Sequence, residues 1–262
     1  MATRKTPSAP LQANTGKAST SVAVRKVTAG NIVSIQETLK AQAVATMGQI
    51  TPGGGPKIRA TKTGFELPDG SKAQVLDVVI LDFITAHSFY DSPYDPKNPA
   101  PAACFARGKN PKDMAPSKNS PNLQADNCQD CPMNEFGSSG NGKACTNNRI
   151  LAVLPADADA DTPIWTLSVS PTALKAFDGY VAGVVRAFGM PPISVVTTVG
   201  LNPATDYPQL TFSNPQPNAN LDTHFARQGE ALDLLMAEPD VSGYQAPSAK
   251  RGPAKKAATA RR

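Results

Sequence analysis

All four cysteines of this chain fall inside one short segment that has almost no means of forming a hydrophobic core. Cys104, Cys128, Cys131 and Cys145 follow the pattern C-x23-C-x2-C-x13-C, and Leu123 is the only leucine, isoleucine or valine in these 42 residues. Burial alone cannot offset the entropy of ordering such a segment, so it needs a cross-link to fold. The segment therefore constrains the possible folds more than any other feature of the sequence.

The cysteine spacing favours a structural zinc ion (Zn2+) held by four thiolates. A Cys-x2-Cys pair brings two sulfurs to one ion from a tight turn, and two further cysteines complete a tetrahedral set. Gly137, Gly140 and Gly142 supply bends that return the chain to the site. Two alternatives remain open: four unrelated free thiols, and an iron–sulfur cluster, although the close-packed cysteine run of ferredoxins is absent.

The positive net charge of the chain, +5, is concentrated at its ends. Residues 1–30 contain five Lys and Arg, residues 241–262 contain six, and neither stretch has an acid. Residues 31–240 contain 15 basic and 21 acidic residues, a charge of −6. The ends are also poor in large apolar residues, which is typical of disordered basic arms.

Several classes of protein are disfavoured. No apolar run approaches the ~18 residues of a membrane span, so no membrane association is expected. The N-terminus lacks the apolar region of a secretory signal, and thiols without an export signal favour metal binding over disulfides. We find no catalytic triad, paired acids or phosphate loop and expect no enzyme. Asp157, Asp159 and Asp161 are interpreted as a solvated turn, because the glycine and distal glutamate of a calcium loop are missing.

Hydrophobic periodicity predicts a mainly β (α+β) chain. A hairpin is expected around Pro68-Asp69-Gly70, because Asp-Gly between β-prone runs is a hairpin signal. Ser170-Pro171 is a good helix start, and the helix should end at Gly189. The expected strands are 58–67, 73–86, 149–154, 164–169, 193–199 and 209–212, and the expected amphipathic helices begin at 31, 170 and 221.

This order of elements, three strands, a helix and two strands, is that of an OB-fold, a small barrel that binds oligonucleotides. It contains one strand too many, which we interpret as 164–169 extending the third strand. The expected organisation is a disordered basic arm (1–30), an OB-like core (31–220) with a zinc-lobe insertion at about 91–148, a C-terminal helix (221–238) and a disordered basic tail (239–262).

Single-stranded nucleic acid binds to grooves where cations follow the phosphates and aromatic rings stack on the bases. Side chains of these two kinds gather in the insertion, at its flanks and on the first strand. The candidates for nucleic-acid contact are Lys57, Arg59, Lys62, Tyr90, Tyr94, Phe105, Arg107, Lys109, Lys112, Phe136, Lys143, Arg149 and Trp165. For Trp165 a place in the core is the alternative, and Phe105 and Phe136 are equally suited to packing on the zinc lobe.

The stretches Cys128–Ser138 and Gly142–Leu154, together with the segments Leu167–Phe177 and Asp206–Phe212, resemble a family of tailed-phage single-stranded DNA-binding proteins. The resemblance covers about residues 100–215. It implies a zinc-bearing OB-like fold that coats and protects single-stranded DNA in phage replication and recombination. One departure is the basic C-terminal end, because proteins of this functional class often end in an acidic tail that recruits partners.

We therefore expect a bacteriophage single-stranded DNA-binding protein in the cytoplasm of the infected bacterial host, with phage or host replication and transcription proteins as further partners. The alternative is a zinc-stabilised phage interaction protein that binds host RNA polymerase or a replisome component. The acidic middle of the chain favours this alternative, because a nucleic-acid surface must then be a local patch.

Overall fold

The chain forms two units, Met1–Thr51 and Pro52–Arg262, in a computed structural model. The structure describes residues 38, 39, 42, 56–93, 95, 97 and 99–246. In the first unit, Thr38, Leu39 and Gln42 are helical, and the expected arm 1–30 and the rest of the helix beginning at 31 lie outside the described residues. So do Tyr94 and the end of the tail, 247–262. Within the described part of the chain, no helix is long and apolar enough to cross a membrane.

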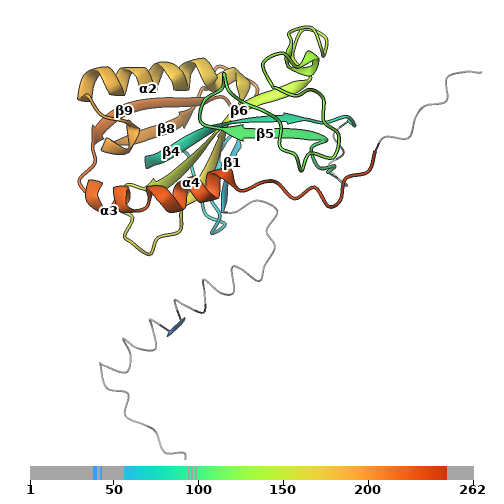
Figure 1. Ribbon diagram of the computed structural model, residues 1–262. Coiled ribbons are helices and arrows are strands. Elements are labelled where there is room, and N and C mark those ends of the chain that lie inside the picture. Colours follow the sequence, from blue (N-terminus) through green and yellow to red (C-terminus); the bar gives the residue numbers. More distant parts are fainter. Residues whose placement is uncertain are drawn as a thin grey trace, which may run out of the picture. The chain divides into compact units, whose positions relative to one another are not determined.

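The second unit is built on one nine-stranded, strongly curled sheet that forms a half-barrel (Figure 1). The strand order is β3-β2-β1-β7-β6-β4-β8-β9. The long strand β4 pairs with β8 near its start and with β5 near its end. Neighbouring strands are antiparallel except β1 and β7, which are parallel. The strands are β1 (Lys57–Thr61), β2 (Gly64–Glu66), β3 (Lys72–Ala73), β4 (Leu76–Phe89), β5 (Cys104–Gly108), β6 (Cys145–Pro155), β7 (Trp165–Val169), β8 (Val195–Leu201) and β9 (Leu210–Pro217).

The two faces of this sheet are covered by different helices (Figure 1). The helices are α2 (Leu174–Phe188), α3 (Leu221–Ala226) and α4 (Gln228–Met236), with short 3-10 turns at Pro132–Asn134, Pro171–Ala173 and Pro192–Ser194. On the inner face, Phe177 of α2 packs with Leu151 and Val199. On the outer face, Ala231 and Leu235 of α4 pack with Val79, Leu81 and Leu154. Alternation along the strands supplies both cores, because successive side chains point to opposite faces.

The helix that the sequence predicted most clearly is confirmed. Ser170 is extended, Pro171 opens a 3-10 turn, and α2 continues to Phe188. Gly189 ends it in the left-handed conformation, with φ +67°, and its N–H donates to the carbonyl oxygen of Val185. Proline at the first turn and glycine after the last are the favoured residues at these places.

Three expectations about the elements need correction. The predicted run 164–169 is a strand of its own, β7, which pairs antiparallel with β6 and does not extend it. The predicted single strand 58–67 is a hairpin, β1 and β2, and the Asp-Gly turn joins β2 to the short β3. The predicted C-terminal helix is interrupted at Arg227, so that α3 and α4 are separate helices.

The segment expected as an insertion at 91–148 is partly built into the sheet. It contains β5, which no hydrophobic pattern indicated, and its last residues begin β6. We name the remaining loop, residues 109–144, the cysteine lobe. The start of the expected tail is also described: the Tyr244 hydroxyl donates a hydrogen bond to the Asp91 carboxylate.

Gly64 at the start of β2 allows a close approach that no other residue type permits. Its φ is +146°, and a Cβ atom there would lie 2.5 Å from the carbonyl oxygen of Ala73. We expect Gly64→Ala to lower the free energy of unfolding by about 1–3 kcal/mol, measured by urea denaturation. Gly179→Ala is the control: it lies in α2 with nothing within 4 Å of a new Cβ, and should raise stability by about 0.5–1 kcal/mol. Equal effects of the two changes would contradict this account of β2.

Candidate functional site

The four cysteines gather at the end of β4 where it is paired on both sides. Phe89 pairs with Cys104 of β5 and with Cys145 of β6. Directly paired residues point to the same face of a sheet, so these two cysteines flank Phe89 on one face. Cys128 and Cys131 come from the cysteine lobe. All four cysteines line one cavity of about 20 Å³, enough for roughly one water-sized group.

The thiols are shielded from solvent and influence one another electrostatically. Cys128, Cys131 and Cys145 are buried, Cys104 is partly buried, and all four are free thiols. Burial, together with the other cysteines, raises the pKa of Cys128 to about 11 and that of Cys145 to about 12. The cavity thus disfavours free thiolates, and a cation would be needed to stabilise the deprotonated forms.

The four thiols are suitable ligands for a soft metal ion, but their side chains do not point to one common centre. Across the described ranges, no three His, Cys, Asp or Glu side chains are arranged so that they could hold a metal ion. Four thiols around one small cavity are nevertheless the ligands of structural zinc sites. Coordination would require these side chains to turn towards a common centre, which leaves zinc binding a proposal.

Asn134 connects the cysteine lobe to the sheet. Its amide Nδ2 donates to the carbonyl oxygen of Cys128 over 2.6 Å, and its backbone N–H donates to that of Cys131 over 2.9 Å. Its Oδ1 accepts from Asn147 Nδ2 on β6 at 2.9 Å and from Lys143 Nζ at 3.3 Å. One side chain therefore fixes the Cys-x2-Cys turn against the strand that carries Cys145.

Some of the predicted nucleic-acid contacts are exposed or partly exposed. Phe136 has 81% of its surface exposed, and Lys143 Nζ lies 5.0 Å from the centre of its ring. Tyr90, at the end of β4, is about half exposed. The remaining accessible candidates are cations: Lys57, Arg59, Lys62 and Lys112.

Other candidates are occupied by contacts within the fold. Phe105 is only 3% exposed, so its ring is not accessible to a base. The Arg107 guanidinium donates to the carbonyl oxygen of Leu235 over 2.7 Å. Lys109 forms an ion pair with Asp82, Arg149 forms one with Asp178 of α2, and Trp165 packs against the inner core.

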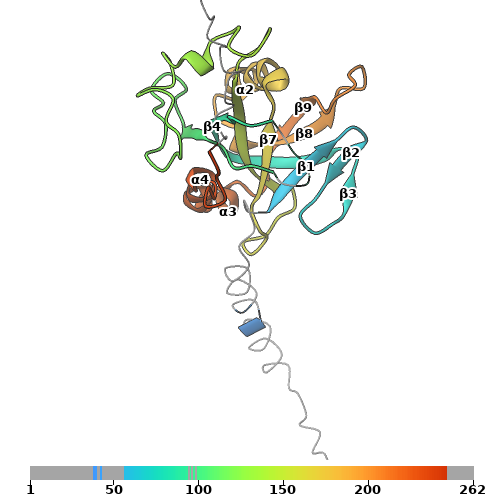
Figure 2. The same ribbon diagram turned by 90° about the vertical axis from the view of Figure 1, so that its right-hand side faces the viewer.

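Six of the accessible candidates fall into two groups, one on the β1–β2 hairpin and one on the cysteine lobe, and Tyr90 follows the end of β4. Lys57, Arg59 and Lys62 belong to the β1–β2 hairpin, whereas Phe136, Lys143 and Lys112 belong to the cysteine lobe. Figure 2 shows the hairpin at one side of the unit and the loops of the lobe at the other. The structure therefore does not bring all predicted contacts into one patch.

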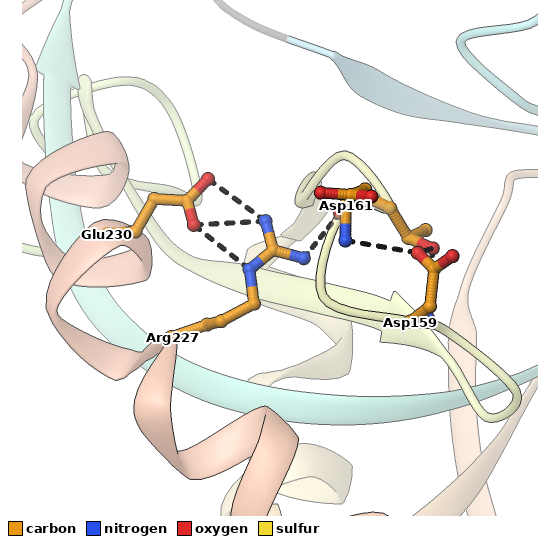
Figure 3. A network of polar contacts seen from close by, with 5 residues as sticks. Asp159, Asp161, Arg227 and Glu230 are labelled. Carbon is orange, nitrogen blue, oxygen red and sulfur yellow. Dashed lines mark hydrogen bonds and ion pairs between the residues drawn. The ribbon is translucent and has the colours of Figure 1, made fainter. Parts of the chain in front are cut away.

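The three aspartates at 157, 159 and 161 lie in a turn closed by its own hydrogen bonds. Asp159 Oδ1 accepts from the Thr162 hydroxyl over 2.6 Å and from the Asp161 N–H over 3.1 Å. Arg227 donates to the Thr162 carbonyl oxygen and pairs with Glu230, as Figure 3 shows. This network holds the turn against the break between α3 and α4, in keeping with a structural interpretation.

The sequence patterns missed two features of the site. His87 lines the cysteine cavity and is 5% exposed, and alternation from Phe89 could have placed it on the same face. Tyr207 is about half exposed in the β8–β9 loop, where the Asn202 N–H donates to the Gln209 carbonyl oxygen over 2.8 Å. No local signal identifies Tyr207 as exposed.

Comparisons with protein-family models, with curated proteins and with solved structures find no match for this chain.

Proposed function

We propose that this chain is a non-catalytic single-stranded DNA-binding protein of the tailed-phage type, with an OB-like barrel and a structural zinc ion held by the four cysteines. The observation that carries the proposal is the strand order β7-β6-β4-β8-β9, with α2 between β7 and β8. With β4 as first strand, this is the order 3-2-1-4-5 of an OB-fold with its helix between the third and fourth strands. Strands β1–β3 are then an addition at the β7 edge.

The same alignment identifies the loops that would meet the ligand. OB-folds bind oligonucleotides on strands two and three and with the loops between strands one and two and between four and five. Here the first of these connections contains β5 and the cysteine lobe, with the exposed Phe136. The second is the β8–β9 loop, with the exposed Tyr207. Both loops therefore offer an accessible ring for stacking on a base.

Zinc completes the proposal because the cysteine lobe has few apolar contacts to hold it together. Its hydrophobic cluster consists of Met114 and Cys128 against Ala106 of β5. The residues that would hold zinc are Cys104, Cys128, Cys131 and Cys145. A bound ion would supply a cross-link between the lobe and two strands of the sheet.

The central test compares the affinity for oligo-dT with that for duplex DNA of the same length, by fluorescence anisotropy at two salt concentrations. We expect tighter binding of the single strand and weaker binding of both forms at high salt, because phosphate contacts release counterions. Equal affinity for the two forms would overturn the proposed function. Binding of neither form, with capture of a host protein from nuclease-treated lysate, would favour the interaction-protein alternative.

Phe136 provides a residue-level prediction. We expect Phe136→Ala to weaken oligo-dT binding by about 1–3 kcal/mol, roughly 5- to 150-fold, because a stacking ring is lost. Phe225→Ala is the matched control, since Phe225 is 63% exposed on α3, away from the lobe. Similar affinities of the two variants would remove Phe136 from the binding surface.

A further inference from the structure

His87 is a buried histidine whose ring nitrogen has no partner. It lies on β4 between Ala106 of β5 and Asn147 of β6. Its Nδ1 atom is buried without a hydrogen bond, and so is Oδ1 of Asn147. Buried polar atoms are nearly always paired, so an unpaired one needs an explanation, and a group bound in the adjoining space is one. The cavity that His87 lines is the one lined by the four cysteines.

The charge of a zinc–thiolate centre shows what kind of partner is needed there. Four thiolates and one Zn2+ ion carry −2 in a shielded place, and N–H groups that donate to the sulfurs offset such charge. Two amides near the cavity are already committed: Asn134 Nδ2 to the Cys128 carbonyl oxygen and Asn147 Nδ2 to Asn134. The ring of His87 keeps unused hydrogen-bonding capacity at Nδ1.

The imidazole ring of His87 has an N–H to donate in either protonation state. Burial, assisted by Lys143 and Arg149, lowers the pKa of His87 to about 4. A neutral imidazole has one N–H to donate and one nitrogen lone pair, and a charged imidazole has two N–H groups.

We propose that His87 is a positioning residue of the zinc centre, whose ring donates an N–H to a zinc-bound thiolate and does not bind the metal. This inference rests on the zinc site of the proposed function. Four thiolates already complete the tetrahedral coordination of a structural zinc ion, so the ring is not needed as a ligand. A donor to sulfur holds a thiolate in place and slows the loss of zinc.

The first experiment uses the full chain without changing position 87. The sequence has only two histidines, so His224→Gln leaves a single imidazole whose nitrogens are read by long-range 1H–15N NMR. In protein loaded with 113Cd in place of zinc, we expect at least one protonated ring nitrogen and no coupling of either ring nitrogen to the metal. Coupling between 113Cd and a His87 nitrogen would overturn the proposal, because His87 would then be a ligand.

The second experiment measures zinc affinity by competition with a chromogenic chelator. We expect His87→Phe to weaken zinc binding by about 10- to 100-fold, with one zinc still bound per chain, and His87→Gln, which keeps an N–H donor, to lose less. The control is His224→Gln: His224 is buried against Asn218 and Ala158, far along the chain from the lobe, and should leave affinity unchanged. Unchanged affinity in His87→Phe would overturn the proposal, whereas wild-type protein without metal would overturn the zinc site itself.

Discussion

Phe177→Ala is expected to lower the free energy of unfolding by about 3–5 kcal/mol, a large part of the 5–15 kcal/mol typical of a domain. Phe177 is fully buried where α2 meets the inner face of the sheet. Its ring makes edge contacts with Phe83 and Phe212, with centres 5.1 and 5.0 Å apart. Removing it leaves a cavity between the helix and strands β4 and β9, which cannot collapse without moving the helix.

Urea denaturation followed by tryptophan fluorescence measures this effect. Trp165 is the only tryptophan in the sequence and packs against the same core, so its emission reports the loss of the core. Phe225→Ala is the control, since the exposed ring of Phe225 should contribute about 0.5 kcal/mol or less. A loss below about 1 kcal/mol for Phe177→Ala would show that α2 does not close the inner face.

Cys128→Ser is expected to release zinc and to unfold the cysteine lobe. Structural zinc sites contribute about 10–16 kcal/mol in small metal-binding peptides, which is far more than the few apolar contacts of the lobe can replace. Hydrogen exchange measured by mass spectrometry should show lost protection across residues 109–144 and at β5, while β7, β8 and β9 remain protected. β5 is included because Cys104 is its first residue.

Leu123→Ala, a change at an exposed lobe side chain, is the control and should leave protection unchanged. Loss of protection throughout β8 and β9 would show that the lobe and the sheet unfold as one unit. Normal protection of the lobe after complete removal of zinc would show that hydrogen bonds such as those of Asn134 are sufficient to hold it.

The sequence predicted which residues would form the candidate site, but it did not predict which of the neighbouring side chains would be buried. The cysteine pattern identified four residues that do line one cavity. Phe105 and Phe136, which looked equivalent in the sequence, have opposite environments: Phe136 is exposed, while Phe105 is covered by the lobe. The Ser120 hydroxyl accepts from the Phe105 N–H, and the Ser117 N–H donates to the Phe105 carbonyl oxygen. Such coverage comes from residues more than ten positions away, which a local pattern does not report.

The sequence by itself determined some of the local elements of this protein, because capping residues, turn residues and apolar periodicity act over a few positions. Ser170-Pro171 and Gly189 bound α2, and the Asp-Gly turn closes the hairpin between β2 and β3. It also confined the thiols to one segment. Only the tertiary structure decided that Cys104 and Cys145 flank Phe89 and that His87 reaches their cavity. Strand pairing and register join residues far apart in the chain, so they depend on the packing of the whole sheet.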